Sequence, residues 1–276
     1  MKDKLKYILK LSRPRFWLYL GGPAILGLVL GATSVGGLLT LENLLLFLYF
    51  LVPANIMLYG INDYFDRDID EENPKKEDKE EKYRGGLFTD SVIGLSTGLS
   101  IPVALFLPQK ALPVMVFFLL LSIAYSAPPL RFKARPFLDS LSNGLYILPF
   151  VLTYIYSTKS FPPVLPVAGG WAWTMAMHTF SAVPDIEPDR KAGIETTATF
   201  LGREKTYAYC GFFWTVSGLL VSLWNLYAGF LILVYPVLAT GFYLSDLSDS
   251  EAYWYYPSIN AFIGMVLTMA GFYTLI

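Results

Sequence analysis

The 276-residue chain has few charged residues, one cysteine and one histidine. Only 16% of its residues are charged, against about 25% in an average soluble domain. The single cysteine, Cys210, excludes an internal disulfide, and together with the single histidine, His178, it excludes zinc-finger and haem-type motifs. A bound metal must therefore be held mostly by oxygen, which favours Mg²⁺, Mn²⁺ or Ca²⁺.

Apolar residues dominate the sequence, with 54% hydrophobic and 16% aromatic residues. This composition excludes a disordered, collagen-like or nucleic-acid-binding chain. A membrane-spanning helix needs about 20 mostly apolar residues. Nine segments of roughly that length are residues 16–34, 43–61, 91–108, 111–127, 139–157, 163–183, 206–224, 226–245 and 256–275. The sequence predicts an all-α, multi-pass membrane protein, with residues 1–276 forming one membrane domain.

The basic residues predict the orientation of these spans. They gather before the first span and in the loops after the second, fourth and sixth spans, whereas only Lys110 and Lys159 fall in the other loops. Loops rich in lysine and arginine stay on the cytoplasmic side. We therefore expect a cell-membrane (inner-membrane) protein with a cytoplasmic N-terminus and, after nine spans, a C-terminus outside.

Half of the 22 acidic residues lie between the second and third spans. The first of them continue the second span out of the membrane. If this stretch stays helical, Asn62, Asp66 and Asp70 are spaced i, i+4, i+8, and Asp63 joins the same face. Four oxygen-bearing side chains on one face repel each other unless a cation lies between them, and hard divalent cations take such ligands.

The sixth span ends with a second acidic pair, Asp185 and Asp189, four residues apart. Pro188 makes a regular helix doubtful at Asp189. Both acidic faces lie at the predicted cytoplasmic ends of membrane helices. Two carboxylate pairs can hold Mg²⁺ ions that in turn bind a diphosphate, because Mg²⁺ takes one or two carboxylates plus phosphate oxygens.

Basic and hydroxyl-bearing residues accompany the acids. A diphosphate leaving group needs both metal and Arg or Lys around its developing charge. The diphosphate-binding candidates are Arg84, Tyr125, Arg131, Lys133, Arg190 and Lys191. Interfacial anchoring of positive-inside loops is the alternative interpretation of these bases.

The two acidic patterns resemble the two Asp-rich motifs of the UbiA-type intramembrane prenyltransferases. The resemblance covers nearly the whole chain, and the segments 12–17, 125–138 and 178–189 are most similar to the carotenoid branch of that family, the lycopene elongase type. It implies a nine-helix bundle around a central cavity with cytoplasmic cap loops. It also implies Mg²⁺ held by Asn62, Asp66, Asp70, Asp185 and Asp189, although Tyr125 and Lys133 match the family's Tyr…Lys element only loosely.

The implied reaction needs no protein nucleophile. An allylic diphosphate, dimethylallyl diphosphate in this branch, ionises to a cation that the alkene of a lipophilic acceptor attacks. The acceptor in this branch is an acyclic C40 carotenoid such as lycopene. The acidic residues Asp66, Asp70, Asp185 and Asp189 are the catalytic candidates, and Asp63 is a further metal-ligand candidate.

The acceptor pocket has four candidates in the fifth and sixth spans. Asn143, Tyr146 and Phe150 follow helical spacing, and aromatic faces stabilise carbocations, but aromatic stripes also serve helix packing. His178 lies two turns before Asp185 and would orient the acceptor, accept a proton or pack. Asp139, at the start of the fifth span, is predicted to be a helix N-cap.

Two other functions remain open from the sequence. Within the same family, the acceptor would be an aromatic quinone precursor, haem, a chlorophyll precursor or a lipid headgroup. The other is a cation-coupled transporter, although transporters usually place their acids near the bilayer midplane. Here the acids lie at helix ends beside bases, which suits a diphosphate delivered from the surface.

Overall fold

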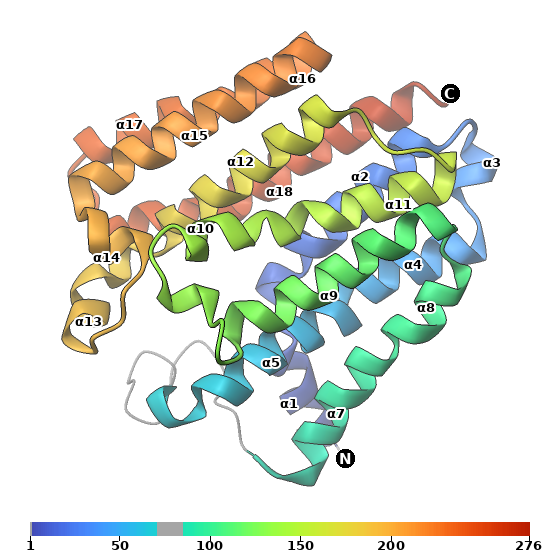
Figure 1. Cartoon of the computed structure of the whole chain (residues 1–276). Helices are drawn as coiled ribbons and strands as arrows, with labels where there is room; N and C mark the ends of the chain where they lie inside the picture. Colours follow the sequence, from blue (N-terminus) through green and yellow to red (C-terminus); the bar gives the residue numbers. More distant parts are fainter. Residues whose placement is uncertain (1, 71–84) are drawn as a thin grey trace. The chain divides into compact units, whose positions relative to one another are not determined.

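The computed structural model describes residues 2–70 and 85–276, and gives only the backbone of residues 2, 3 and 68–70. Within these residues the chain is helical, with no strand (Figure 1), so the predicted all-α class is confirmed. The α-helices are α1 (Lys2–Leu11), α2 (Trp17–Gly31), α3 (Val35–Leu38), α4 (Leu41–Leu51), α5 (Pro53–Asp70), α7 (Gly86–Gly98), α8 (Ser100–Phe106), α9 (Leu112–Ser126), α10 (Leu138–Ser142), α11 (Leu148–Thr158), α12 (Val164–Ser181), α13 (Ile186–Lys191), α14 (Thr197–Leu201), α15 (Arg203–Trp224), α16 (Leu226–Ile232), α17 (Val234–Leu244) and α18 (Asp249–Tyr273). Short 3₁₀ turns are η1 (Pro14–Phe16), η2 (Gln109–Ala111), η3 (Phe132–Ala134), η4 (Asn143–Ile147) and η5 (Val183–Asp185).

Each of the nine predicted spans falls largely on helix within the described part of the chain. Five helical stretches there are long and apolar enough to cross a membrane. They are Leu41–Arg67, Gly86–Phe106, Gln109–Ser126, Arg203–Trp224 and Leu226–Leu244. The multi-pass membrane character is therefore supported, and the count of nine stays a prediction.

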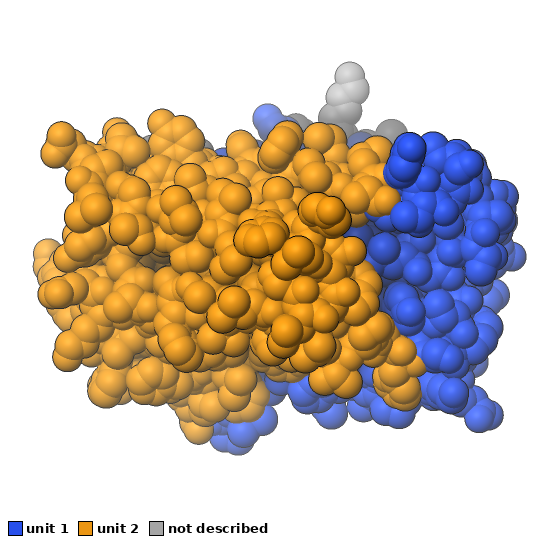
Figure 2. Space-filling view, turned by 90° about the horizontal axis from the view of Figure 1, so that it is seen from above, with its two compact units in different colours: residues 1–130, 149–160, 271–276 blue, residues 131–148, 161–270 orange. Residues whose placement is uncertain are grey.

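The chain divides into two compact units, coloured separately in Figure 2. Unit 1 contains residues 1–130, 149–160 and 271–276, and unit 2 contains residues 131–148 and 161–270. The acidic motif on α5 belongs to unit 1, whereas the acidic motif on η5 and α13 belongs to unit 2. Each motif is therefore described within its own unit.

In unit 1, α2 and α11 approach closely at a glycine. A Cβ atom built on Gly27 would lie 2.2 Å from Thr153 Oγ1 and 2.4 Å from the Phe150 carbonyl oxygen. The Thr153 hydroxyl donates a 2.9 Å hydrogen bond to the carbonyl of Ala24 on α2. Small residues that let backbones approach, together with hydroxyl bonds between helices, are typical of membrane helix packing.

The second predicted span is broken between α4 and α5, and the sequence explains the break. Pro53 has no N–H to continue the hydrogen-bond ladder of α4, but it is tolerated in the first turn of α5. The buried Asn55 amide donates to the carbonyls of Phe50 (2.9 Å) and Leu51 (3.0 Å). The carbonyls that end α4 are thereby satisfied, and α5 runs without interruption to Asp70.

Unit 2 is built on the long helix α15, which runs alongside α12 (Figure 1). Its core is aromatic. Trp214 of α15 stacks on Tyr256 of α18 at 5.4 Å between ring centroids, and Phe180 of α12 lies 4.5 Å from the same tyrosine ring. Because these three side chains are fully buried, they hold the end of α12 in place, directly before the second acidic motif.

Candidate active site

The first acidic motif lies on a helix, as its spacing predicts. Helix α5 continues to Asp70, so Asn62, Asp66 and Asp70 follow one another at single-turn intervals along one face. The side chains of Asn62 and Asp66 are partly exposed, and that of Asp70 lies outside the described residues. This face can present an amide oxygen and carboxylates to one ligand.

Two neighbouring side chains anchor the start of this motif. Ser126, the last residue of α9, donates a 3.1 Å hydrogen bond to Asn62 Oδ1. The Arg13 guanidinium donates a 2.7 Å bond to Asp63 Oδ1 and lies 4.6 Å from the centre of the Tyr59 ring. Asp63 is only 1% exposed. Asp63 is a metal-ligand candidate from the sequence. In the structure it forms a buried ion pair with Arg13.

The second acidic motif forms a compact turn after α12. Asp185 ends η5 and immediately precedes α13, which contains Asp189. Pro188 lies in the first turn of α13, where a missing N–H breaks no helical bond. Gly193 has φ +68° and closes the helix, with the Ile194 N–H donating to the Asp189 carbonyl at 2.9 Å. The partly exposed Asp185 and Asp189 therefore stay one turn apart despite the proline.

The donors of both motifs match a hard divalent cation. Asn62, Asp66, Asp185 and Asp189 offer only oxygen atoms, and all four are partly exposed, which is the chemistry that Mg²⁺ requires. Among the side chains that the structure describes, no three His, Cys, Asp or Glu residues form a metal-binding group. Asp70, whose side chain is not described, belongs to the predicted set.

The diphosphate-binding candidates are distributed over both units. Arg131 and Lys133 lie at and within η3, partly exposed, and Tyr125 lies in the last turn of α9 in unit 1. Lys191 is exposed at the end of α13. Arg84 lies outside the described residues.

Arg190, another diphosphate candidate, has protein partners. Its guanidinium donates to Glu187 Oε1 at 3.0 Å and to the Thr199 carbonyl at 3.1 Å. It therefore connects α13 to α14.

The aromatic stripe expected on the fifth span does not keep one helical period. Asn143 and Tyr146 lie in the 3₁₀ turn η4 of unit 2, whereas Phe150 lies in α11 of unit 1. Pro149 cannot donate to the carbonyl four residues earlier, so the chain is drawn into a tighter turn before α11 begins. Asn143 is buried and donates to the Asp139 carbonyl at 2.6 Å.

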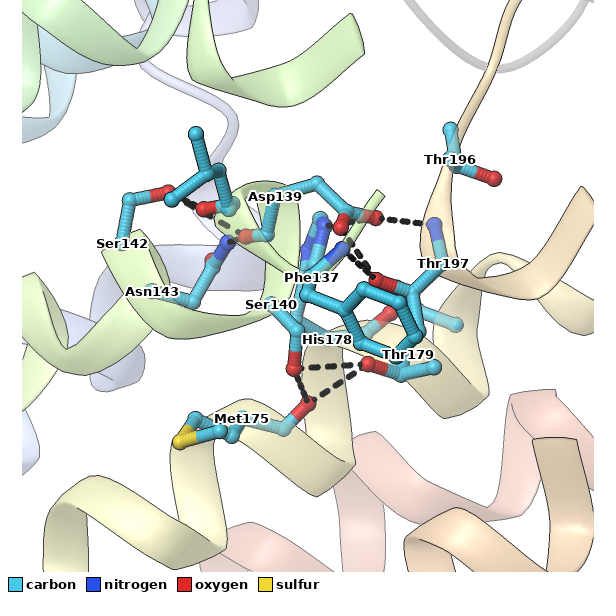
Figure 3. Close-up of polar contacts among 12 residues, drawn as sticks. Phe137, Asp139, Ser140, Ser142, Asn143, Met175, His178, Thr179, Thr196 and Thr197 are labelled. Carbon is cyan, nitrogen blue, oxygen red and sulfur yellow. Dashed lines mark hydrogen bonds and ion pairs between the residues drawn. The ribbon is translucent and has the colours of Figure 1, made fainter. Parts of the chain in front are cut away.

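The expectation that Asp139 is the N-cap of its own helix is wrong. Phe137 occupies the N-cap position of α10, and Asp139 lies in its first turn. Its carboxylate instead accepts hydrogen bonds from the backbone N–H (2.9 Å) and the hydroxyl of Thr197 (Figure 3). Its Oδ2 lies 3.9 Å from His178 Nε2. The signal available in the sequence was an ionisable residue inside an apolar span, which demands a partner.

The comparisons with known proteins decide the family. The model of the UbiA prenyltransferase family matches residues 20–254 of this chain. The chain belongs to the UbiA prenyltransferase family. It is 51% identical over 266 residues to the lycopene elongase/hydratase of Halobacterium salinarum, covering 96% of this chain and 97% of that protein. It is 30% identical to the protein of the same name from Corynebacterium glutamicum, covering 98% of this chain and 97% of that protein.

Solved structures of UbiA homologues share the fold. A homologue from Archaeoglobus fulgidus, bound to GPP and Mg²⁺, aligns with a TM-score of 0.73 and 22% identity over 96% of this chain and 99% of that chain. The apo homologue from Aeropyrum pernix K1 aligns with a TM-score of 0.72 and 16% identity over 95% of this chain and 98% of that chain. The predicted family and its similarity to the lycopene elongase branch are confirmed, and this UbiA protein is a membrane-embedded prenyltransferase.

Proposed function

We propose that this prenyltransferase moves a dimethylallyl group from dimethylallyl diphosphate to the ends of an acyclic C40 carotenoid such as lycopene. The observation that supports this most strongly is the 51% identity to a lycopene elongase/hydratase along nearly the whole of both chains. A second support is the structure of the Archaeoglobus fulgidus homologue bound to DMAPP and Mg²⁺, which has the same fold.

In this proposal the two acidic motifs hold Mg²⁺ through five residues. These are Asn62, Asp66, Asp70, Asp185 and Asp189. When bound, Mg²⁺ neutralises the charge that develops on the departing diphosphate. Asp63 remains paired with Arg13 at 2.7 Å and fixes the start of the first motif. Its negative charge is then compensated by the protein and not by the metal.

The bases and Tyr125 bind the other diphosphate oxygens. Arg131, Lys133 and Lys191 are partly or fully exposed, and Arg84 contributes from the segment outside the described residues. Arg190 contributes through a guanidinium that Glu187 and Thr199 already orient. Charge-assisted donors around a diphosphate are worth most when they are held in position before the charge develops.

The acceptor binds among apolar side chains of the spans, with Asn143, Tyr146, Phe150 and His178 as its proposed surroundings. The alkene carbon attacks the allylic cation and leaves a tertiary cation, which loses a proton or takes up water. The active-site mouth and the N-terminus face the cytoplasm, and the C-terminus lies outside. This orientation rests on the gathering of bases in alternate loops.

A second candidate acceptor is an aromatic acid. The chain is 29% identical to the 4-hydroxybenzoate octaprenyltransferase of Shewanella sediminis, over 74% of this chain and 71% of that protein. The identity is lower and the coverage shorter than for the lycopene elongase/hydratases. The carotenoid acceptor is therefore favoured.

The test is a competition assay with the purified protein in lipid vesicles containing Mg²⁺ and dimethylallyl diphosphate. Lycopene and 4-hydroxybenzoate are offered together, and products are identified by mass. We expect carotenoids heavier by C5 units, whereas transfer only to 4-hydroxybenzoate would contradict the proposal.

Three variants accompany this competition assay. Asp66→Ala and Asp185→Ala should abolish the products. Asp246→Ala, which removes an exposed acid outside both motifs, should retain them.

A further inference from the structure

A fully buried carboxylate in unit 2 has no part in the proposed metal site. Asp139 on α10 is 0% exposed. Its oxygens accept the backbone N–H and the hydroxyl of Thr197, and Oδ2 lies 3.9 Å from the Nε2 atom of His178 (Figure 3). A buried charge inside a membrane domain is costly unless donors and an opposite charge compensate it.

The Thr197 hydroxyl has a fixed direction. It accepts a 2.7 Å hydrogen bond from the Phe137 N–H, so its own proton points to Asp139. Thr197 is in turn held by the capping box of α14, in which Thr196 and Thr199 exchange side-chain and backbone bonds. These contacts fix the position of the Asp139 carboxylate. Its Oδ2 atom then lies near both the Thr197 N–H and the His178 imidazole.

His178 on α12 lies beside this buried carboxylate and is not itself fully buried. Its side chain is 21% exposed. It lies on α12, one turn before the end of the helix and seven residues before Asp185. At 3.9 Å, a distance longer than a hydrogen bond, the negative carboxylate favours the tautomer with its proton on Nε2 and stabilises the imidazolium that forms when the other nitrogen takes a proton. The pair therefore has the arrangement of a general base and its orienting acid.

We propose that His178 is the base that removes the proton released by the prenyl transfer, and that Asp139 is its positioning residue. This rests on the proposed function. After the new carbon–carbon bond forms, Nδ1 takes a proton from the carbon next to the tertiary cation. The electron pair of that C–H bond becomes a double bond, and the imidazolium later returns its proton to water.

A purely structural role for Asp139 would fasten α14 to α10 through Thr197 and leave the chemistry unchanged. A structural role and a role in proton transfer have different effects on two steps, the ionisation of the diphosphate and the loss of the proton. Ionisation of the allylic diphosphate precedes the proton transfer, so release of inorganic diphosphate does not require the base. Formation of the coupled alkene requires it, whereas capture of the tertiary cation by water does not.

The experiment measures diphosphate release and coupled product for wild type, His178→Gln and Asp139→Asn in lipid vesicles with Mg²⁺, dimethylallyl diphosphate and lycopene. The asparagine carbonyl can still accept the Thr197 N–H. Tyr209→Phe is the matched control, because it removes a hydroxyl that contacts Ser140 in the same network, at 2.9 Å.

We expect His178→Gln to keep diphosphate release and to form the hydrated coupled carotenoid, while the coupled alkene falls about 10²-fold, the usual contribution of a general base. Coupled alkene at the wild-type rate, or a parallel loss of diphosphate release, would overturn the proposal. If wild type itself releases no diphosphate, the proposed function has failed instead.

A spectroscopic measurement tests Asp139 without turnover. The chain has one histidine, so solid-state ¹⁵N spectra of histidine-labelled protein in lipid contain only His178. We expect the Nε2–H tautomer in wild type and a changed tautomer ratio in Asp139→Asn, with Tyr209→Phe matching wild type. Identical spectra for wild type and Asp139→Asn would contradict the positioning role.

Discussion

The buried ion pair between Arg13 and Asp63 gives a quantitative prediction for stability. The two side chains meet at 2.7 Å, with exposures of 15% and 1%. Removing one partner of a buried pair leaves an uncompensated charge and costs about 3–5 kcal/mol. Because Arg13 keeps some contact with solvent, we expect Arg13→Ala to lower the free energy of unfolding by about 3 kcal/mol, the lower end of that range.

The double variant measures the interaction energy of the Arg13–Asp63 pair apart from the other contacts of each side chain. Arg13→Ala with Asp63→Ala should cost less than the two single variants together, by a coupling energy of about 2 kcal/mol. Unfolding is followed by tryptophan fluorescence in detergent micelles titrated with SDS. Strictly additive losses would refute the reasoning that the two charges compensate one another.

An exposed ion pair in unit 2 is the control for this cycle. Arg190 and Glu187 meet at 3.0 Å but are 48% and 72% exposed. Exposed pairs contribute about 0–1 kcal/mol, so Glu187→Ala should change the unfolding free energy by less than about 1 kcal/mol. If Glu187→Ala lowers the unfolding free energy as much as Arg13→Ala does, burial does not determine how much an ion pair contributes to stability.

Three further predictions concern packing, the helix break and the metal. Gly27→Ala should lower the free energy of unfolding by about 1–3 kcal/mol, because the added methyl group overpacks the contact between α2 and α11. Gly22→Ala on the same helix, where a Cβ meets nothing within 4 Å, should leave it unchanged. Equal effects of the two variants in thermal unfolding would contradict this prediction. Asn55→Leu should lower the free energy of unfolding by about 1–3 kcal/mol, because it removes both hydrogen bonds to carbonyls at the end of α4. An unchanged midpoint of thermal unfolding would contradict this prediction. Chelation with EDTA should abolish product formation and added Mg²⁺ should restore it, whereas turnover that persists in EDTA would exclude the metal.

The helices and the register of the first acidic motif could be predicted from the sequence because both are local properties. A run of about 20 apolar residues predicts a span wherever it lies. Asn62, Asp66 and Asp70 share a face as soon as the helix continues, which α5 does. The turn that carries Asp189 also depends on nearby residues, with Pro188 in the first turn and Gly193 at the end of α13.

The partners of the buried charges could not be predicted in this way. Arg13 meets Asp63 across 50 residues of sequence, and Asp139 meets Thr197 across 58. Such contacts depend on how helices pack, and one sequence does not fix that packing. The N-cap expected at Asp139 was wrong for this reason, because the distant threonine offered two donors to a carboxylate that the packing buries.

The most direct test of the proposed prenyl transfer is product analysis in a lycopene-producing host that expresses this chain. The account predicts new carotenoids whose masses exceed that of lycopene by one or two C5 units, with or without water. It also predicts their absence when Asp66→Ala is expressed at the same level. Unchanged lycopene in cells that contain the folded wild-type protein and dimethylallyl diphosphate would contradict the account.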